Sequence, residues 1–189
     1  MQYRLNKDDL LKVLEGWNAF LKRKVHLIAC GGTALTLLNM KNSTKDVDFM
    51  VPNEKEYAYL TSTLKKLGYK LVTGSGWKKD GDYYIFDLFC GNKIHTTELM
   101  QSPLVEGNHY LFKEYSRIYV GILNSYDLII SKLFRGSTVD FEDCALLVDE
   151  KELDIDLLKK KFKETAKYYF GEDKVLKELK YFLRKIGRD

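Results

Sequence analysis

The 189-residue sequence lacks the features that mark membrane-spanning or disordered chains. It contains only two prolines, which argues against a proline-rich linker or a disordered tract. No apolar run approaches the roughly 20 residues that cross a bilayer, and the first residues lack the apolar core of a signal peptide. These absences predict a cytoplasmic protein with no membrane partner.

Cysteine is also scarce. Cys30, Cys90 and Cys144 are odd in number and widely spaced, so they indicate neither a disulfide framework nor a zinc site. Cys30 and Cys90 lie in apolar, strand-like segments, and we expect them to be small core residues.

The net charge of +4 lies entirely in the C-terminal segment. Residues 151–189 carry 12 basic and 8 acidic side chains, whereas residues 1–150 carry 19 of each. Two interpretations remain open for this excess. It can belong to a solvated helical face, or it can favour a polyanionic partner.

Hydrophobic periodicity predicts strands and helices in alternation up to about residue 123, and only helices after it. The strands are expected at 25–30, 46–51, 69–73, 83–90, 111–115 and 117–122. The helices are expected at 7–23, 33–39 and 54–67, and then in four segments that begin at Ser125. The predicted fold class is therefore α/β (α+β): a mixed β-sheet domain over residues 1–123 with flanking helices, and a C-terminal helical region over 124–189 packed on it.

The chain is organised around residues 27–51. The buried strand before Gly31-Gly32 runs into a turn whose backbone N–H groups can face an anion. Asp46 and Asp48 follow, two residues apart on the next predicted strand, where side chains two apart share a face. A phosphate seat beside paired carboxylates indicates metal-assisted phosphoryl chemistry on a nucleotide.

Asp87 is a third carboxylate, inside the otherwise apolar segment 84–89. An unpaired carboxylate in such a strand would be costly, so it needs a partner, a cation or water. If its strand lies beside that of Asp46 and Asp48, three carboxylates converge. Three hard oxygen ligands with open positions suit Mg²⁺.

Each of these features also has a purely structural interpretation. The two glycines can form a tight turn where a helix and a strand pack closely. The Asp-x-Asp pair can be simply solvated. Asp87 can be a structural residue paired to Lys93 or Arg117.

A pair of basic residues, Lys132 and Arg135, lies three apart on a predicted helix and therefore shares a face. Two interpretations are equally favoured for Lys132. Its ammonium can bind phosphate, or both basic residues can pair with Asp140 and Asp143 across the turn at Gly136.

Four segments together resemble the signature of the nucleotidyltransferase superfamily. Gly31–Leu35 and Thr44–Phe49 match its glycine turn and Asp-x-Asp, in the form found in minimal nucleotidyltransferases and AbiEii-type toxins. Lys132–Arg135 and Asp140–Asp143 look like the helical Lys and Asp-rich helix of those relatives. The resemblance covers roughly residues 25–145, and the last 40 residues contribute nothing to it.

The resemblance implies a nucleotidyltransferase fold and a set of site residues. The implied nucleotide-binding residues are Gly31, Gly32, Thr33 and Lys132. The implied catalytic residues, which would also bind Mg²⁺, are Asp46, Asp48 and Asp87. Asp87 would in addition orient or deprotonate the acceptor hydroxyl.

The functional hypothesis is an enzyme that transfers a nucleoside monophosphate from an NTP, such as ATP, to a hydroxyl group. The acceptor is a protein, an RNA or a small molecule, which the sequence does not distinguish. A narrower form makes the protein the toxin of a toxin–antitoxin pair, with an antitoxin as partner. The alternative is an inactive module that binds a nucleotide, RNA or protein on the same fold.

Overall fold

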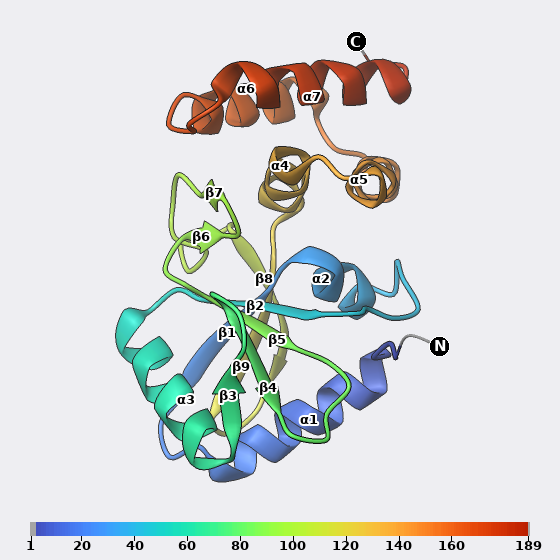
Figure 1. Ribbon diagram of the computed structural model, residues 1–189. Coiled ribbons are helices and arrows are strands. Elements are labelled where there is room, and N and C mark those ends of the chain that lie inside the picture. Colours follow the sequence, from blue (N-terminus) through green and yellow to red (C-terminus); the bar gives the residue numbers. More distant parts are fainter. Residues whose placement is uncertain (1–2, 189) are drawn as a thin grey trace. The chain divides into compact units, whose positions relative to one another are not determined.

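The computed structural model describes residues 3–188, and the chain divides into two compact units (Figure 1). The first, here called the sheet unit, comprises the residues up to 92 together with 102–123. The second, the helical unit, comprises 93–101 and the residues from 124 onward. Residues 93–101, which the sequence analysis placed in the α/β part, therefore cluster with the helices.

The sheet unit is built on a seven-stranded mixed sheet with the order β3-β4-β5-β2-β1-β9-β8. Two neighbouring pairs, β2–β5 and β1–β9, are parallel, and the other pairs are antiparallel. The mixed α/β class predicted from the sequence is confirmed. The strands are β1 (Val25–Ala29), β2 (Val47–Val51), β3 (Tyr69–Leu71), β4 (Gly76–Lys79), β5 (Phe86–Cys90), β8 (His109–Glu114) and β9 (Ile118–Leu123).

Three helices belong to the sheet unit: α1 (Lys7–Phe20), α2 (Gly31–Leu37) and α3 (Glu54–Lys66). The side chains of Asn6 and Asn53 cap α1 and α3 by accepting hydrogen bonds from backbone N–H groups of the first turn. Trp17 of α1 packs against Phe86 of β5, with 4.5 Å between ring centroids. This aromatic contact joins the apolar stripe of α1 to the sheet.

Strand β4 (Gly76–Lys79) lies between two strands predicted from the sequence, in a segment where no strand was expected. Glycine, lysine and aspartate dominate residues 74–82, so local propensity does not favour a strand there. The strand forms because β3 and β5 flank it, and Trp77 pairs in register with Phe86. Strand β5 begins at Phe86, later than predicted, and Cys90 at its end is exposed rather than part of the core.

The helical unit contains a short hairpin and all the predicted C-terminal helices. The hairpin of β6 (Lys93–Ile94) and β7 (Thr97–Glu98) was not expected from the sequence. The helices are α4 (Ser125–Arg135), α5 (Thr138–Lys151), α6 (Ile155–Ala166) and α7 (Glu172–Lys185). Phe134 of α4 packs against Phe162 and Tyr169, each with 4.9 Å between ring centroids. Within residues 3–188 no helix has the length and apolar character needed to cross a membrane.

Candidate functional site

Gly31 begins α2 directly against the carboxylate of Asp48. Its φ of +55° lies in the left-handed region, which favours glycine. A Cβ atom at this position would lie 2.4 Å from Oδ2 of Asp48, far inside van der Waals contact. At Gly32 a Cβ atom would lie 2.8 Å from Oγ1 of Thr44. The two glycines therefore let the start of α2 approach the segment that carries the Asp-x-Asp pair.

Thr33 joins α2 to the beginning of β2. Its buried hydroxyl accepts a hydrogen bond from the backbone N–H of Asp48 at 2.9 Å and donates to the carbonyl of Asp46 at 3.4 Å. The hydroxyl of Thr44 donates to the same carbonyl at 2.7 Å. Thr33 thus has a positioning role within the fold, and its predicted contact with a nucleotide stays a prediction.

Asp48 and Asp87 occupy directly paired positions on the parallel strands β2 and β5. Neighbouring strands lie about 4.8 Å apart, and residues paired in register point to the same face. Asp48 is buried and Asp87 is half-buried. Like charges directly opposite each other are destabilising. The pair is therefore suited to a cation, whose charge would relieve this repulsion.

Asp87 is held by a turn that the sequence analysis did not connect with the site. The hydroxyl of Ser75 donates to Oδ1 of Asp87 at 2.7 Å. Gly76 lies opposite Asp87 on β4, and a Cβ atom there would be only 2.3 Å from Oγ1 of Thr73. The sequence offered Lys93 or Arg117 as structural partners, but this hydrogen bond comes from a small polar residue in an apparent loop.

Asp46 lies just before β2, not within it. Its carbonyl is bound by threonine hydroxyls, so the strand begins one residue later than predicted. The alternation argument therefore applies to Asp48 and not to Asp46. Across residues 3–188 no three His, Cys, Asp or Glu side chains lie close enough to hold a metal ion.

The donor set of Asp48 and Asp87 fits Mg²⁺ that arrives with a nucleotide. Mg²⁺ is commonly bound by one or two carboxylates, and substrate phosphates and water complete its octahedral shell. The structure brings these two predicted ligands together in register. The participation of Asp46 as a third ligand stays a prediction.

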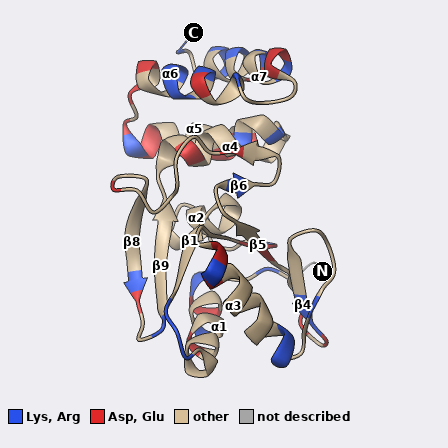
Figure 2. Cartoon of the chain, turned by 90° about the vertical axis from the view of Figure 1, so that its left-hand side faces the viewer, with Lys and Arg blue, Asp and Glu red and all other residues tan. Residues whose placement is uncertain are grey.

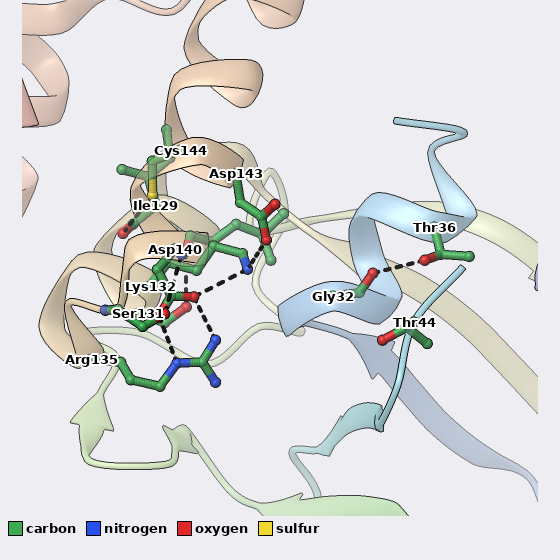
Figure 3. Close-up of polar contacts among 12 residues, drawn as sticks. Gly32, Thr36, Thr44, Ile129, Ser131, Lys132, Arg135, Asp140, Asp143 and Cys144 are labelled. Carbon is green, nitrogen blue, oxygen red and sulfur yellow. Dashed lines mark hydrogen bonds and ion pairs between the residues drawn. The ribbon is translucent and has the colours of Figure 1, made fainter. Parts of the chain in front are cut away.

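Lys132, in the helical unit, is buried and paired with two aspartates. Its Nζ lies 2.8 Å from Oδ2 of Asp143 and 3.5 Å from Oδ1 of Asp140 (Figure 3). The side chain of Lys132 is 2% exposed. The ion-pair interpretation of Lys132 thus describes its contacts. A phosphate-binding role for this buried ammonium stays a prediction.

Asp140 is the centre of this buried network. Burial raises the pKa of its carboxyl group, but hydrogen bonds from Arg135 and Ser137, together with the charges of Arg135 and Lys132, outweigh burial and lower it to about 2. Arg135 donates through two guanidinium nitrogens, one of them Nε at 2.8 Å, and Ser137 forms a capping box with Asp140. The network therefore contains ionised Asp140 and ties α4 to α5.

The two matches to known proteins differ in how much of the chain they cover. Residues 109–188 match the family model described as "Nucleotidyltransferase of unknown function (DUF6036)", which covers less than half of the chain. Among solved structures, the chain is similar to the crystal structure of ANT(2″)-Ia in complex with adenylyl-2″-tobramycin. The TM-score is 0.47 at 14% identity, covering 93% of this chain and 98% of that chain. No curated protein gives a match.

The family match contains two of the four motif segments, Lys132–Arg135 and Asp140–Asp143, and leaves out the glycine turn and the Asp-x-Asp. Of the predicted site residues, the matched range contains Lys132 alone. It also extends through the last 40 residues, where the motif resemblance is silent. The description of the family agrees with the class of enzyme that the motifs indicate. The finer assignment to the AbiEii-like branch stays a prediction.

Proposed function

We propose that the protein is a nucleotidyltransferase that moves a nucleoside monophosphate from an NTP to a hydroxyl group of an acceptor. The observation that carries the proposal is the in-register pairing of Asp48 with Asp87, next to the glycine turn at Gly31. The family match at residues 109–188 supports the same class of reaction from another part of the chain.

In this proposal the sheet unit binds the nucleotide through its backbone and its carboxylates. The N–H groups of Gly31 and Gly32 would contact the triphosphate, as the family resemblance implies. Asp48 and Asp87 would hold Mg²⁺, with Asp46 as a further ligand. When bound, Mg²⁺ supplies positive charge that offsets the charge of the phosphates.

Asp87 would also orient the acceptor. Its carboxylate is fixed at Oδ1 by the hydroxyl of Ser75, so its orientation is set before a substrate arrives. The acceptor oxygen would form a bond to the α-phosphorus while the bond to the bridging oxygen breaks. Pyrophosphate would leave with that electron pair, and the hydroxyl proton would pass to Asp87.

The test is the transfer of label from an NTP that carries radioactive phosphorus at the α position. The purified protein is incubated with Mg²⁺ and a panel of acceptors: cellular RNA, cellular protein and hydroxyl-bearing small molecules. We expect label on one acceptor class with the wild-type protein, and a loss of at least about a hundredfold in Asp48→Asn and Asp87→Asn, because charge stabilisation by such groups is worth several kcal/mol.

The matched control is Asp80→Asn, which removes an exposed carboxylate of the sheet unit that pairs with Lys70. This variant should transfer label at the wild-type rate. Equal transfer by Asp48→Asn would contradict the site assignment. Transfer of label from the γ position instead would contradict the reaction class.

A second candidate function is a binding module without turnover. It is favoured by one observation: Asp46, a predicted metal ligand, lies before β2 rather than on the strand with Asp48. In that case titration calorimetry would show NTP binding that does not depend on Mg²⁺, and no labelled product would form.

The toxin form of the proposal rests on the AbiEii-like motifs alone. Expression of the wild-type protein should then arrest growth, and both an antitoxin partner encoded by a neighbouring gene and the substitution Asp48→Ala should relieve the arrest. Harmless overexpression of the active protein would count against a toxin role.

A further inference from the structure

Helix α7 presents a basic face opposite the side that it buries. Its buried residues fall on one helical stripe, namely Val175, Leu179, Phe182 and Leu183. At 3.6 residues per turn, Lys177 and Tyr181 point away from that stripe, and Lys174 and Lys180 flank them. All four are exposed. Figure 2 shows Lys and Arg recurring along α6 and α7.

Aromatic rings are exposed on and beside this face. Tyr181 is 55% exposed, and its ring packs edge-on against Phe141 at 5.2 Å, which fixes the ring without covering it. In the turn before α7, Phe170 is fully exposed and Tyr168 is 76% exposed. Between them Tyr169 packs against Phe134 and anchors the turn. The core of the helical unit therefore does not use the rings of Tyr168 and Phe170.

The lysines of this face are available for an external anion. Within residues 3–188, Lys174, Lys177 and Lys180 form no ion pair with an acidic side chain. Glu178 is turned toward α4, where its Cδ lies 3.5 Å from the position of a Cβ atom built on Gly136. The acids Glu172 and Asp173 are confined to the first turn of α7.

We propose that this face of α7, with the preceding turn, binds single-stranded nucleic acid. Lysines at successive helical turns can follow a phosphate backbone, and exposed rings among them can stack on unpaired bases. An acidic protein segment would match the charge but gives no reason for fully exposed Phe170. A helix that docks on a partner through its apolar face needs an apolar groove or stripe, whereas these rings stand among charges. This inference does not depend on the proposed enzymatic activity.

The test measures fluorescence anisotropy of a short, labelled, mixed-sequence RNA, and of the DNA of the same sequence, with the full-length protein at several salt concentrations. The charge variant combines Lys174→Gln, Lys177→Gln and Lys180→Gln. Its affinity should fall, and the slope of log K against log salt should become shallower by about two, since each phosphate contact contributes about 0.7. The matched control removes three exposed lysines of the sheet unit: Lys22→Gln, Lys55→Gln and Lys66→Gln.

The aromatic variant combines Tyr168→Ala with Phe170→Ala. It should lower affinity about tenfold or more because stacking on a base is lost, and the salt slope should not change. Its matched control replaces two exposed rings of the sheet unit, Phe20→Ala and Tyr83→Ala, and should bind as the wild type does. Asp48→Asn should also bind the strand normally, which separates this inference from the fate of the proposed reaction.

Three results would overturn the proposal. The first is the absence of strand binding by the wild-type protein. The second is equal weakening by the charge variant and its sheet-unit control, which would indicate diffuse attraction. The third is equally tight binding of polyglutamate together with no effect of the aromatic variant, which would assign the face to an acidic protein. If the proposal holds, tighter binding of the RNA or of the DNA shows which of the two this face of α7 prefers.

Discussion

The backbone of Gly31 and the carboxylate of Asp48 fill adjoining space with no room for another atom. Two independent features require glycine at position 31. Its φ is positive, and a Cβ atom there would lie 2.4 Å from Oδ2 of Asp48. The Asp48 carboxylate, on which the proposed reaction depends, can occupy its position because Gly31 has no side chain.

Replacement of this glycine should be costly. We expect Gly31→Ala to lower the free energy of unfolding by about 1–3 kcal/mol, because the left-handed backbone is strained with a Cβ atom and Asp48 must move. The matched control is Gly16→Ala in α1, where an added Cβ atom meets nothing within 4 Å. This control should raise stability by about 0.5–1 kcal/mol. Urea denaturation measures both, and equal effects would contradict the account of Gly31.

At the scale of elements, charge joins α4 to α5, and a hydrogen bond from Ser75 orients the carboxylate of Asp87 on β5. In the helical unit, Asp140 is wholly buried, and Arg135, Ser137 and Lys132 surround its carboxylate. Removing one member of such a network leaves an uncompensated buried charge. The contacts of Lys132 belong to this network and stabilise the packing of α4 on α5.

The pH dependence of stability follows from the pKa of Asp140. Because its folded-state pKa of about 2 lies below the ordinary value of 3.8, the ionised group stabilises the fold at neutral pH. This contribution, about 2 kcal/mol at 1.36 kcal/mol per pKa unit, is present above pH 4 and is lost as the pH falls toward 2. Asp140→Asn should therefore destabilise the protein most at neutral pH, and the difference from wild type should shrink below pH 4.

The measurement is chemical denaturation of wild type and variant from pH 2 to pH 7. Asp149→Asn, an exposed position on the same helix, is the control and should change stability by less than about 0.5 kcal/mol. A deficit of Asp140→Asn that is equally large at every pH would show that its charge is not the source of the stability.

Elements with strong internal periodicity could be predicted from the sequence, whereas those that depend on partners could not. The stripe of α7 and the largely apolar run of β1 are local patterns, and both elements form as predicted. Strand β4 contains glycine and lysines and forms only because β3 and β5 flank it. The β6–β7 hairpin, with two residues in each strand, is too short to leave a periodic signal.

The residue types of the candidate site could be predicted from the sequence, but the contacts that position these residues could not. Asp48 and Asp87 stand out as carboxylates in apolar strands. Their pairing depends on the parallel register of β2 and β5, which is a long-range property. The antiparallel pairing of β4 with β5 brings Ser75 to Asp87, and no local pattern marks that contact. Asp46 falls outside the strand because threonine hydroxyls, not a neighbouring strand, bind its carbonyl.

At the scale of the whole molecule, the two units carry different features. The sheet unit carries the paired carboxylates, and the helical unit carries the buried charge network and the basic face of α7. The family match extends across residues of both units. Under the proposed function, the two carboxylates bind the metal and the nucleotide. They do not determine which acceptor the protein uses.

Titration calorimetry of a non-hydrolysable NTP analogue, with and without Mg²⁺, tests the central claim most directly. Wild type should bind the analogue only with Mg²⁺, and Asp48→Asn should not bind it. Asp80→Asn should bind normally. Undiminished, Mg²⁺-dependent binding by a folded Asp48→Asn protein, or wild-type binding that is indifferent to Mg²⁺, would contradict the claim that Asp48 and Asp87 form the nucleotide–metal site.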